Sequence, residues 1–192
     1  MKKYPKRLIP DKRYVSFTED EIKKGKLGRW HDPTDMRTPG SIFNDDDSVN
    51  ASVLDYKRFP GLSCNLIPPS KCKDLKISVS EELLEEYALG TDPPKIRKKD
   101  FEIISHREVM EIDTKGILEE ELPYKFEKDN HICKIKIKHK PLKGNFSHCE
   151  FDLLPSHIKK GQEVKFRNQK GWRKNLILAL RRAFENHGKK CN

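Results

Sequence analysis

The segment that most constrains the fold is the alternating stretch from His131 to Leu154, HICKIKIKHKPLKGNFSHCEFDLL. Apolar side chains occupy every second position before Lys140 and again after Ser147, with charged or polar side chains between them. Successive side chains of a β-strand point to opposite faces of a sheet. The alternation therefore predicts two half-buried strands joined as a hairpin.

The pairing register of this hairpin follows from the requirement that both faces be chemically coherent, because a shift by one residue exchanges the two faces. We expect Ile137 to lie opposite Cys149 and Ile135 opposite Phe151, which makes one face wholly apolar. The same register sets lysines opposite carboxylates on the other face, and such cross-strand pairs are worth about 0.2–1 kcal/mol each. The hairpin is therefore predicted to have one buried face and one charged face.

The turn of the hairpin is expected at residues 142–144, a three-residue loop in which Gly144 takes the left-handed conformation. A register shifted by one residue would make a two-residue turn and set His139 opposite His148. It would also set the isoleucines of the first strand against acidic residues of the second. We therefore prefer the three-residue loop, in which the two histidines lie on opposite faces.

The segments around the hairpin complete an α+β domain. Residues 122–127 and 162–167 alternate like strands, whereas residues 172–186 carry apolar side chains along one side of a helix. We therefore expect residues 95–192 to form a basic α+β domain. In this domain an antiparallel sheet is built on the 131–154 hairpin, and the C-terminal helix 172–186 packs on one face.

The first half of the chain is predicted to be irregular. Residues 1–94 form a loop-rich N-terminal region in this interpretation, because Gly, Pro, Asp and Asn recur between positions 26 and 60. One short helix is expected at residues 81–89, with Ser80 as its N-cap. Residues 75–79, immediately before it, are a candidate strand.

Two shorter segments allow local predictions. Thr18 and Glu21 have the spacing of a capping box and Gly25 follows as a stop, which predicts a helix of less than two turns. The stretch FEIISHREVMEI, residues 101–112, is ambiguous: its first four residues favour a strand, and the rest is compatible with a helix.

The composition excludes several classes of protein. Of the 192 residues, 34% are hydrophobic and 36% are charged. No apolar run approaches the ~18 residues needed to cross a bilayer, and the N-terminus lacks an apolar signal region. Five cysteines without CxxC spacing favour reduced thiols over a disulfide framework or a zinc site. We therefore expect a soluble protein without a membrane partner, cytoplasmic or nuclear (or nucleoid-associated) rather than secreted.

The net charge of +10 is unevenly distributed along the chain. Residues 131–192 hold 16 Lys and Arg against 4 Asp and Glu, whereas residues 1–130 hold 24 against 26. Asymmetry of this size indicates a polyanionic partner for the basic part, most often nucleic acid. The alternative explanation of the lysines is a solvated strand face that resists aggregation.

The basic residues predict contact with a phosphate backbone. Lysines at every second position of a strand recur about 6.5–7 Å apart, which is close to the phosphate spacing along a nucleic-acid strand. Because few aromatic side chains are available for stacking, we expect backbone contact rather than readout of base sequence. The candidate nucleic-acid-binding residues are Lys134, Lys136, Lys138, Lys140, Lys143, Lys165, Arg167, Lys170 and Arg173.

Metal-dependent nuclease chemistry is an alternative. Asp152, Glu163 and Lys165 have the Asp…Glu-x-Lys layout of one nuclease class. In that chemistry two carboxylates hold Mg²⁺ or Mn²⁺, and a lysine stabilises the charge of the attack. The same acid-x-Lys spacing recurs at four other places in this charged chain, so the pattern is weakly specific. Apart from this alternative, the sequence implies no metal or cofactor.

Histidine chemistry is a further possibility, because a metal-free ribonuclease needs a base and an acid near the scissile phosphate. His148 is the candidate base, since the preferred register sets it on the polar face among lysines that would lower its pKa. His139 and His157 are expected to have packing or surface roles.

These observations favour a basic nucleic-acid-binding protein, a non-catalytic subunit of a larger assembly that contacts the phosphate backbone. One alternative is a protein-interaction or adaptor subunit, in which the N-terminal region contacts a protein partner or a second copy of the chain. An exposed Leu178 on the C-terminal helix would then belong to the contact surface. The other alternative is the nuclease.

Overall fold

The computed structural model describes most of the chain, namely residues 15–34, 40–50, 54, 62–69, 74–89, 95–142, 144–158 and 171–191. In the helix that starts at residue 171, the described side chains are those of residue 175 and of residues 177 onwards.

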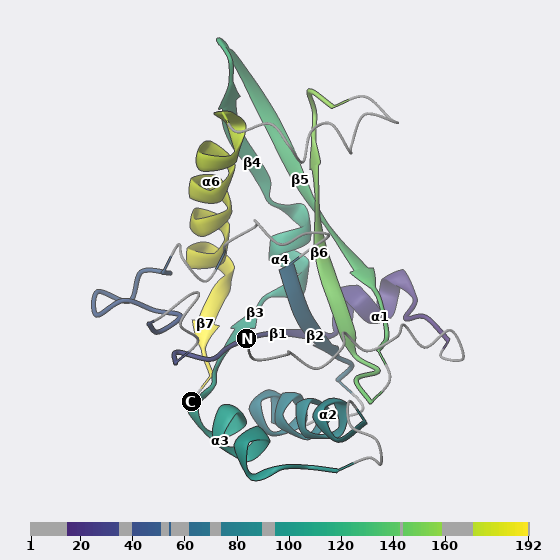
Figure 1. The fold of residues 1–192 in the computed structure, drawn as a ribbon. Coiled ribbons are helices and arrows are strands. Elements are labelled where there is room, and N and C mark those ends of the chain that lie inside the picture. Colours follow the sequence, from purple (N-terminus) through teal and green to yellow (C-terminus); the bar gives the residue numbers. More distant parts are fainter. Residues whose placement is uncertain are drawn as a thin grey trace.

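A seven-stranded sheet forms the centre of the described residues (Figure 1). Each pair of neighbouring strands in this sheet is antiparallel. Across the sheet the strands are β4 (Glu121–Phe126), β5 (Asp129–His139), β6 (His148–Pro155), β2 (Leu62–Ile67), β1 (Lys26–His31), β3 (Glu108–Ile112) and β7 (Gly188–Lys190).

Five helices accompany this sheet within the described residues, and the α+β class predicted from the sequence is confirmed. In Figure 1, α6 runs beside β4, whereas α2 and α3 lie together at the lower end of the sheet. The helices are α1 (Glu19–Lys24), α2 (Leu75–Leu89), α3 (Lys98–His106), α4 (Thr114–Glu119) and α6 (Gly171–His187).

The two faces of the sheet carry separate cores. On the larger core, Phe184 of α6 packs edge-on against Phe151 of β6, with ring centroids 5.4 Å apart. The smaller core lies on the opposite face, where Val79 and Leu83 of α2 pack with Val109 of β3. Burial of one such side chain contributes about 1.5–3 kcal/mol. The expected C-terminal helix is thus present, and its buried apolar residues Ala179, Leu180, Ala183 and Phe184 pack on the apolar face of the sheet.

The predicted hairpin forms, but its register differs from the prediction by two residues. Ile137 lies opposite Phe151, and Ile135 lies opposite Leu153. A shift by two residues preserves the faces, so the predicted buried and charged faces are correct although the predicted partners are wrong. The sequence pattern specifies which face each residue occupies, and several registers satisfy it equally.

The register is decided at the tip of the hairpin. Leu142 and Asn145 form an isolated antiparallel β-bridge, and the Lys140 amide donates a hydrogen bond to the His148 carbonyl. The Leu142–Asn145 bridge is already offset by one residue from the predicted register. One more residue lies between these two pairs on the second strand than on the first, which adds the second residue of the shift. Gly144 has a φ of +80°, so the predicted left-handed glycine is confirmed within a longer tip.

The N-terminal half contributes more regular structure than predicted. β1 and β2 lie in the interior of the sheet, β1 pairing with β3 and β2 with β6, so strands from both sides of residue 94 form one sheet. The turn-rich composition of residues 26–60 does not predict β1, which includes a glycine. Gly28 lies close to α2, and a Cβ at this position would be 3.0 Å from Val79.

The helix expected at residues 81–89 is present within α2, but its predicted start is wrong. Residues 75–79 form the first turns of α2 rather than a strand, and the Ile77 amide donates to the side chain of Asp74 before the helix. Ser80 therefore lies inside the helix instead of capping it. The ambiguous segment 101–112 forms the end of α3 followed by β3. This helix-then-strand order is the reverse of the order that its residues favour.

The short helix expected after Thr18 is confirmed. The Thr18 hydroxyl accepts a hydrogen bond from the Glu21 amide at 3.2 Å, and the Glu21 carboxylate accepts one from the Thr18 amide at 2.9 Å. This is the reciprocal arrangement that the spacing predicts. The strand predicted at residues 162–167 lies outside the described residues.

Candidate functional site

The predicted lysines of β5 lie on an exposed face, but most of them are paired. Lys134 forms an ion pair with Glu121 of β4 at 2.9 Å. Lys138 forms an ion pair with Asp152. Lys136 has no carboxylate partner among the described residues. We call Lys134, Lys136 and Lys138 the lysine row.

The ion pairs weaken the case for the lysine row as a phosphate-binding surface. Lys140, which follows the row, pairs with Glu150. Four lysines therefore face three carboxylates, and a phosphate would have to compete with those carboxylates. Exposed ion pairs contribute only about 0–1 kcal/mol each, so a phosphate could displace the carboxylates. The net positive charge of this surface is nevertheless small. Of the other predicted basic residues, Lys143, Lys165, Arg167, Lys170 and the side chain of Arg173 lie outside the described residues.

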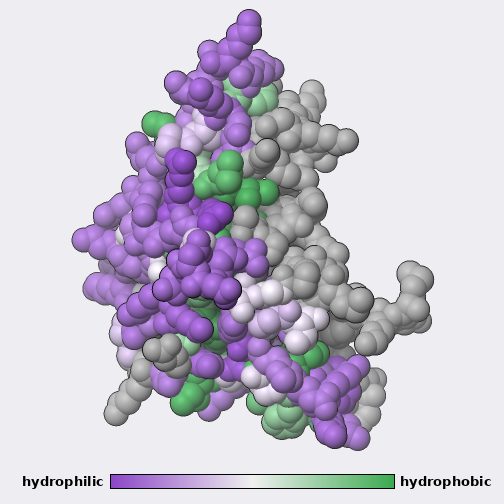
Figure 2. All heavy atoms as spheres, turned by 90° about the vertical axis from the view of Figure 1, so that its left-hand side faces the viewer, coloured by the Kyte–Doolittle hydropathy of each residue, from purple (hydrophilic) through white to green (hydrophobic). Residues whose placement is uncertain are grey.

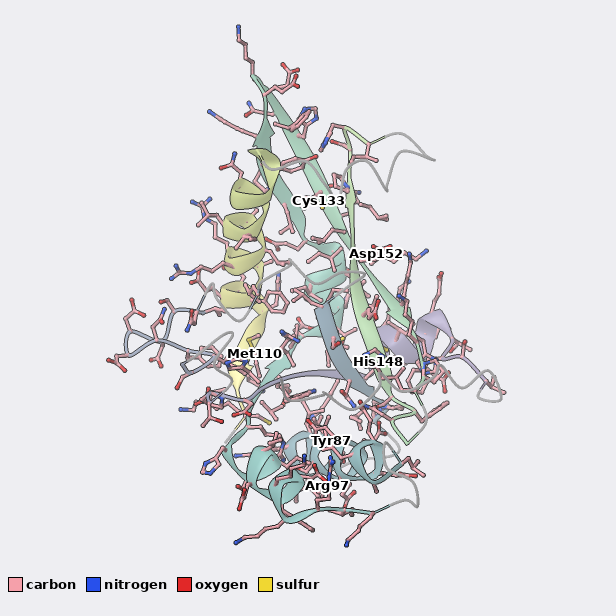
Figure 3. All side chains as sticks on the ribbon, viewed as in Figure 1. Tyr87, Arg97, Met110, Cys133, His148 and Asp152 are labelled. Atoms are coloured by element: carbon pink, nitrogen blue, oxygen red, sulfur yellow. The ribbon has the colours of Figure 1, made fainter. Side chains whose placement is uncertain are left out.

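Asp152, the first member of the predicted nuclease trio, lies on β6 in contact with Lys138 (Figure 3). Glu163 and Lys165 lie outside the described residues, so the trio has no geometry to compare with its expected role. Within the described ranges, no group of three or more His, Cys, Asp or Glu side chains is arranged to hold a metal ion.

His148 is buried, and both of its ring nitrogens are engaged (Figure 3). Nδ1 lies 2.8 Å from the carbonyl oxygen of Lys140, and Nε2 lies 3.3 Å from the hydroxyl of Ser63. Its pKa is lowered mainly by burial, and the nearby charge of Lys140 contributes less. The pKa of His148 is therefore lowered, as expected, but burial and not the neighbouring lysine is the main cause. With both nitrogens bonded to the protein, His148 is poorly placed to take a proton from a substrate.

The other two histidines have packing contacts. His139 stacks on Phe17 with centroids 4.2 Å apart, accepts a hydrogen bond from the Phe17 amide at Nδ1, and has Nε2 2.7 Å from the Phe146 carbonyl. His157 stacks on Phe126 at 4.3 Å and hydrogen-bonds to the hydroxyl of Tyr124. Both histidines fill space between elements.

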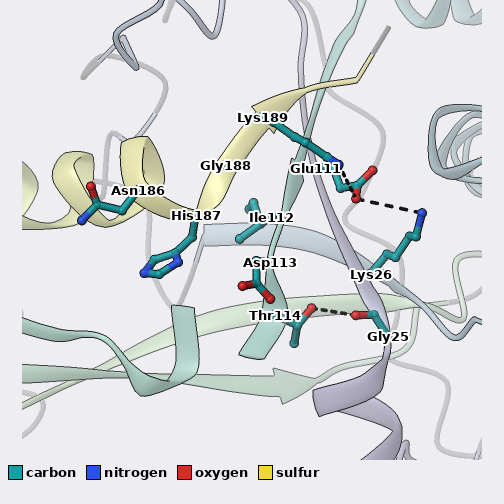
Figure 4. A pocket seen from close by; sticks show the side chains of 10 residues that line it. All are labelled: Gly25, Lys26, Glu111, Ile112, Asp113, Thr114, Asn186, His187, Gly188 and Lys189. Atoms are coloured by element: carbon teal, nitrogen blue, oxygen red, sulfur yellow. Dashed lines mark hydrogen bonds and ion pairs between the residues drawn. The ribbon is translucent and has the colours of Figure 1, made fainter. Parts of the chain in front are cut away.

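A cleft of about 410 Å³ lies where α1 meets β1, β3 meets α4 and α6 meets β7 (Figure 4). No sequence pattern predicted this cleft. Its walls come from three short segments that are far apart in the chain, and no spacing within any one of them signals a site. The lining residues are Gly25, Lys26, Glu111, Ile112, Asp113, Thr114, Asn186, His187, Gly188 and Lys189.

One carboxylate in this cleft binds two ammonium groups. Oε1 of Glu111 lies 4.0 Å from Nζ of Lys26 and 3.4 Å from Nζ of Lys189 (Figure 4). The three side chains come from β3, β1 and β7, which are neighbours in the sheet. This group therefore carries one more positive charge than negative charge.

The other wall of the cleft is built around His187. Nε2 of His187 lies 2.8 Å from Oε2 of Glu120, and its carbonyl accepts a hydrogen bond from the Asp113 amide at 2.8 Å. The ring packs on Gly116, where a Cβ would lie 2.4 Å from Nδ1 of His187. The close approach requires glycine at this position and holds the end of α6 against α4.

The surface seen in Figure 2 is largely hydrophilic, with small separate hydrophobic areas. Comparison of the chain with protein-family models, with curated proteins and with solved structures returned no match. None of the described helices is long and apolar enough to cross a membrane.

Proposed function

We propose that the chain binds nucleic acid through the phosphate backbone, in a non-catalytic role. The observation that supports this is the uneven distribution of charge along the chain. Residues 131–192 hold 16 Lys and Arg against 4 Asp and Glu, a formal charge of +12. Residues 1–130 hold 24 against 26, a formal charge of −2.

Residues 1–130 are therefore far too weakly acidic to neutralise the basic part of the chain. A concentrated excess of positive charge favours a polyanionic partner, because lysines and arginines that neutralise phosphates release the counterions condensed on the nucleic acid. Two stretches contribute most of the chain's net charge of +10: residues 1–14 hold six Lys and Arg against one Asp, and residues 159–170 hold five against one Glu. The lysine row is a secondary contributor, since its lysines already face carboxylates.

Fluorescence anisotropy with labelled single- and double-stranded DNA and RNA, across a salt series, tests this proposal. Three matched variants each lose three positive charges: Lys2, Lys3 and Lys6 to Gln; Lys159, Lys160 and Lys165 to Gln; and Lys134, Lys136 and Lys138 to Gln. We expect the first two to weaken binding more than the third. Each lost phosphate contact should reduce the slope of log K against log salt by about 0.9 for duplex and 0.7 for single strands.

The same titrations can reject the proposal. Absence of binding to all four nucleic acids at low salt would remove it. If the lysine-row variant were the weakest binder, the phosphate contacts would belong to the hairpin instead. Parallel incubations with Mg²⁺, Mn²⁺ and EDTA follow the length of the substrate, and metal-dependent cleavage would favour the nuclease alternative with Asp152, Glu163 and Lys165.

Contact with a protein partner is a second candidate function, favoured by apolar side chains exposed on the helices. Phe101 of α3 and Ile77 of α2 are 54% and 55% exposed, and Leu178 of α6, whose exposure the sequence predicts, is 45% exposed. Light scattering coupled to gel filtration tests self-association. A dimer that dissociates in Phe101→Ser, but persists in Leu178→Ser, would assign the contact to α3. A concentration-independent monomer would exclude a second copy as the partner.

A further inference from the structure

We propose that the cleft of Figure 4 binds a phosphate group between the ammonium groups of Lys26 and Lys189, and that the phosphate belongs to a nucleic-acid strand. This inference rests on the proposed function and adds to it a location within the described fold. It concerns a site that the sequence analysis did not find.

The two lysines of the cleft are incompletely paired, although the lining holds two lysines against two carboxylates. Lys26 and Lys189 share a single oxygen of Glu111, at 4.0 and 3.4 Å. These distances are longer than those of tight ion pairs, about 2.7–2.9 Å, so neither ammonium group is saturated by this carboxylate. Both lysine side chains are also substantially exposed, at 48% and 72%, which leaves their remaining hydrogen-bond donors accessible to a ligand.

The other two carboxylates of the cleft region have partners within the fold. Oδ1 of Asp113 accepts a hydrogen bond from the Lys115 amide at 3.2 Å, where it caps α4. Oε2 of Glu120 pairs with His187. Asp113 is the group that most opposes an anion here, and it lies on the wall away from the two lysines in Figure 4.

The size and chemistry of the cleft also suit a phosphate. A cleft of about 410 Å³ accommodates a phosphate together with the sugar attached to it. Asn186 adds an amide donor to the lining, whereas Nε2 of His187 is used in the pair with Glu120 and the Thr114 hydroxyl in a bond to the Gly25 carbonyl at 2.9 Å. Ammonium and amide donors around a polar cleft suit a phosphate oxygen better than an apolar ligand.

Matched double variants test the site by anisotropy with short labelled single-stranded DNA and RNA at constant salt. Lys26→Gln with Lys189→Gln removes the two cleft ammonium groups, and Lys125→Gln with Lys128→Gln removes two exposed charges from the β4–β5 hairpin, at the other edge of the sheet. We expect the cleft variant to bind about three- to tenfold more weakly, and the control to change by less than about twofold. Equal losses would overturn the cleft as a binding site.

A gain of affinity provides the sharper test, because misfolding cannot produce it. Glu111→Gln removes the carboxylate that competes with a phosphate, so binding should tighten about threefold. Glu102→Gln, on the exposed side of α3, makes the same change in net charge outside the cleft and should have a smaller effect. If Glu111→Gln binds no more tightly than Glu102→Gln, the proposal is wrong.

Titration with inorganic phosphate and with a nucleoside monophosphate, followed by amide NMR, distinguishes the sources of the phosphate. Shifts at Asp113 and Gly188 that saturate only with oligonucleotide support a backbone phosphate. Tight saturation by the monophosphate alone would make the ligand a free nucleotide and overturn the strand assignment. If the wild-type chain bound no oligonucleotide, the proposed function would fail, and an absence of phosphate-induced shifts would show that the cleft fails as well.

Discussion

Lys138 forms an ion pair with Asp152, although the β5–β6 ladder sets Asp152 directly opposite Lys136. Lys140 pairs in the same diagonal sense with Glu150, which lies opposite Lys138. Diagonal neighbours on one face of an antiparallel pair are within reach of long side chains. The shifted pairing leaves Lys136 without a carboxylate partner among the described residues.

The diagonal ion pair should matter little for stability. Asp152→Asn is expected to lower the free energy of unfolding by less than about 1 kcal/mol, since partly exposed pairs contribute little. It releases Lys138, so nucleic-acid binding should become slightly tighter. Urea denaturation and anisotropy measure the two effects, and weaker binding in a folded Asp152→Asn protein would point to a direct role for this carboxylate.

Phe184 is predicted to be the most important contact of α6 with the sheet. It is fully buried and packs edge-on against Phe151. Phe184→Ala should lower the free energy of unfolding by about 3–5 kcal/mol, because it removes a large apolar side chain and leaves a cavity. The control is Leu178→Ala on the exposed side of the same helix, where we expect less than about 1 kcal/mol. Similar urea midpoints for the two variants would contradict the assigned packing of α6.

Replacing Gly144 or Gly40 by alanine distinguishes two destabilising effects, namely backbone strain and steric clash. Both have positive φ, at +80° and +99°, but a Cβ on Gly144 would lie 3.0 Å from backbone atoms of Glu85, whereas a Cβ on Gly40 meets nothing closer than 3.4 Å. Gly40→Ala should therefore cost about 1 kcal/mol, the conformational penalty alone. Gly144→Ala should cost at least about 1 kcal/mol more, because the hairpin tip must move away from α2. Equal losses in chemical denaturation would show that the tip does not rest on the helix.

Glu82 of α2 fastens the same hairpin to the helix. Its Oε2 accepts hydrogen bonds from the amide and the hydroxyl of Ser147, at 3.0 and 2.5 Å. Glu82→Ala leaves these donors without their acceptor and should lower the free energy of unfolding by about 1–3 kcal/mol. Glu82→Gln keeps a carbonyl oxygen there and should cost clearly less. If the two variants were equally unstable, the charge rather than the acceptor would be the important property.

The contribution of Glu82 to the free energy of unfolding should also depend on pH. Burial raises the pKa of its carboxyl above the ordinary value. The folded chain therefore binds a proton here more readily than the unfolded chain, so this group's contribution is full below the unfolded pKa and is lost as the pH rises through the folded pKa. Glu82→Gln should remove that loss. Urea denaturation of both proteins from pH 4 to pH 7 compares the slopes, and parallel slopes would contradict the raised pKa.

The contribution of His148 to stability should have the opposite pH dependence. Burial lowers its pKa, so the unfolded chain binds the proton more readily, and stability should fall as the pH drops below the ordinary histidine value of about 6.5. His148→Gln is expected to reduce this fall between pH 7 and pH 5. His106→Gln, at an exposed position of α3, is the control and should behave like the wild type. A wild-type slope in His148→Gln would show that this imidazole titrates normally.

Several elements follow from sequence alone because their cause is local. The capping box of Thr18 and Glu21 needs only residues of one turn, and it forms as predicted. The alternation of β5 and β6 assigns each side chain to its face, since the faces of a strand have a period of two. The left-handed conformation of Gly144 is likewise a property of the residue.

The errors arise where distant segments decide the structure. β1 contains Gly28 and lies at the start of a stretch rich in turn residues, and it becomes a strand because β2 and β3 pair with it on both sides. Residues 75–79 resemble a strand by composition, yet they are helical because Leu75 and Val79 pack as one face of α2 against β1 and β3. Tertiary packing overrides local propensity in both cases.

The sequence by itself determined the class of the fold, the faces of the central hairpin and the uneven distribution of charge, because these depend on residue type and on periodicity along the chain. Tertiary structure alone decided the register, the diagonal ion pairs of the lysine row and the cleft between Lys26, Glu111 and Lys189. Each of these depends on which segments meet in space. Ion pairs and clefts are made by side chains only a few ångströms apart, and separation along the chain carries no information about that distance.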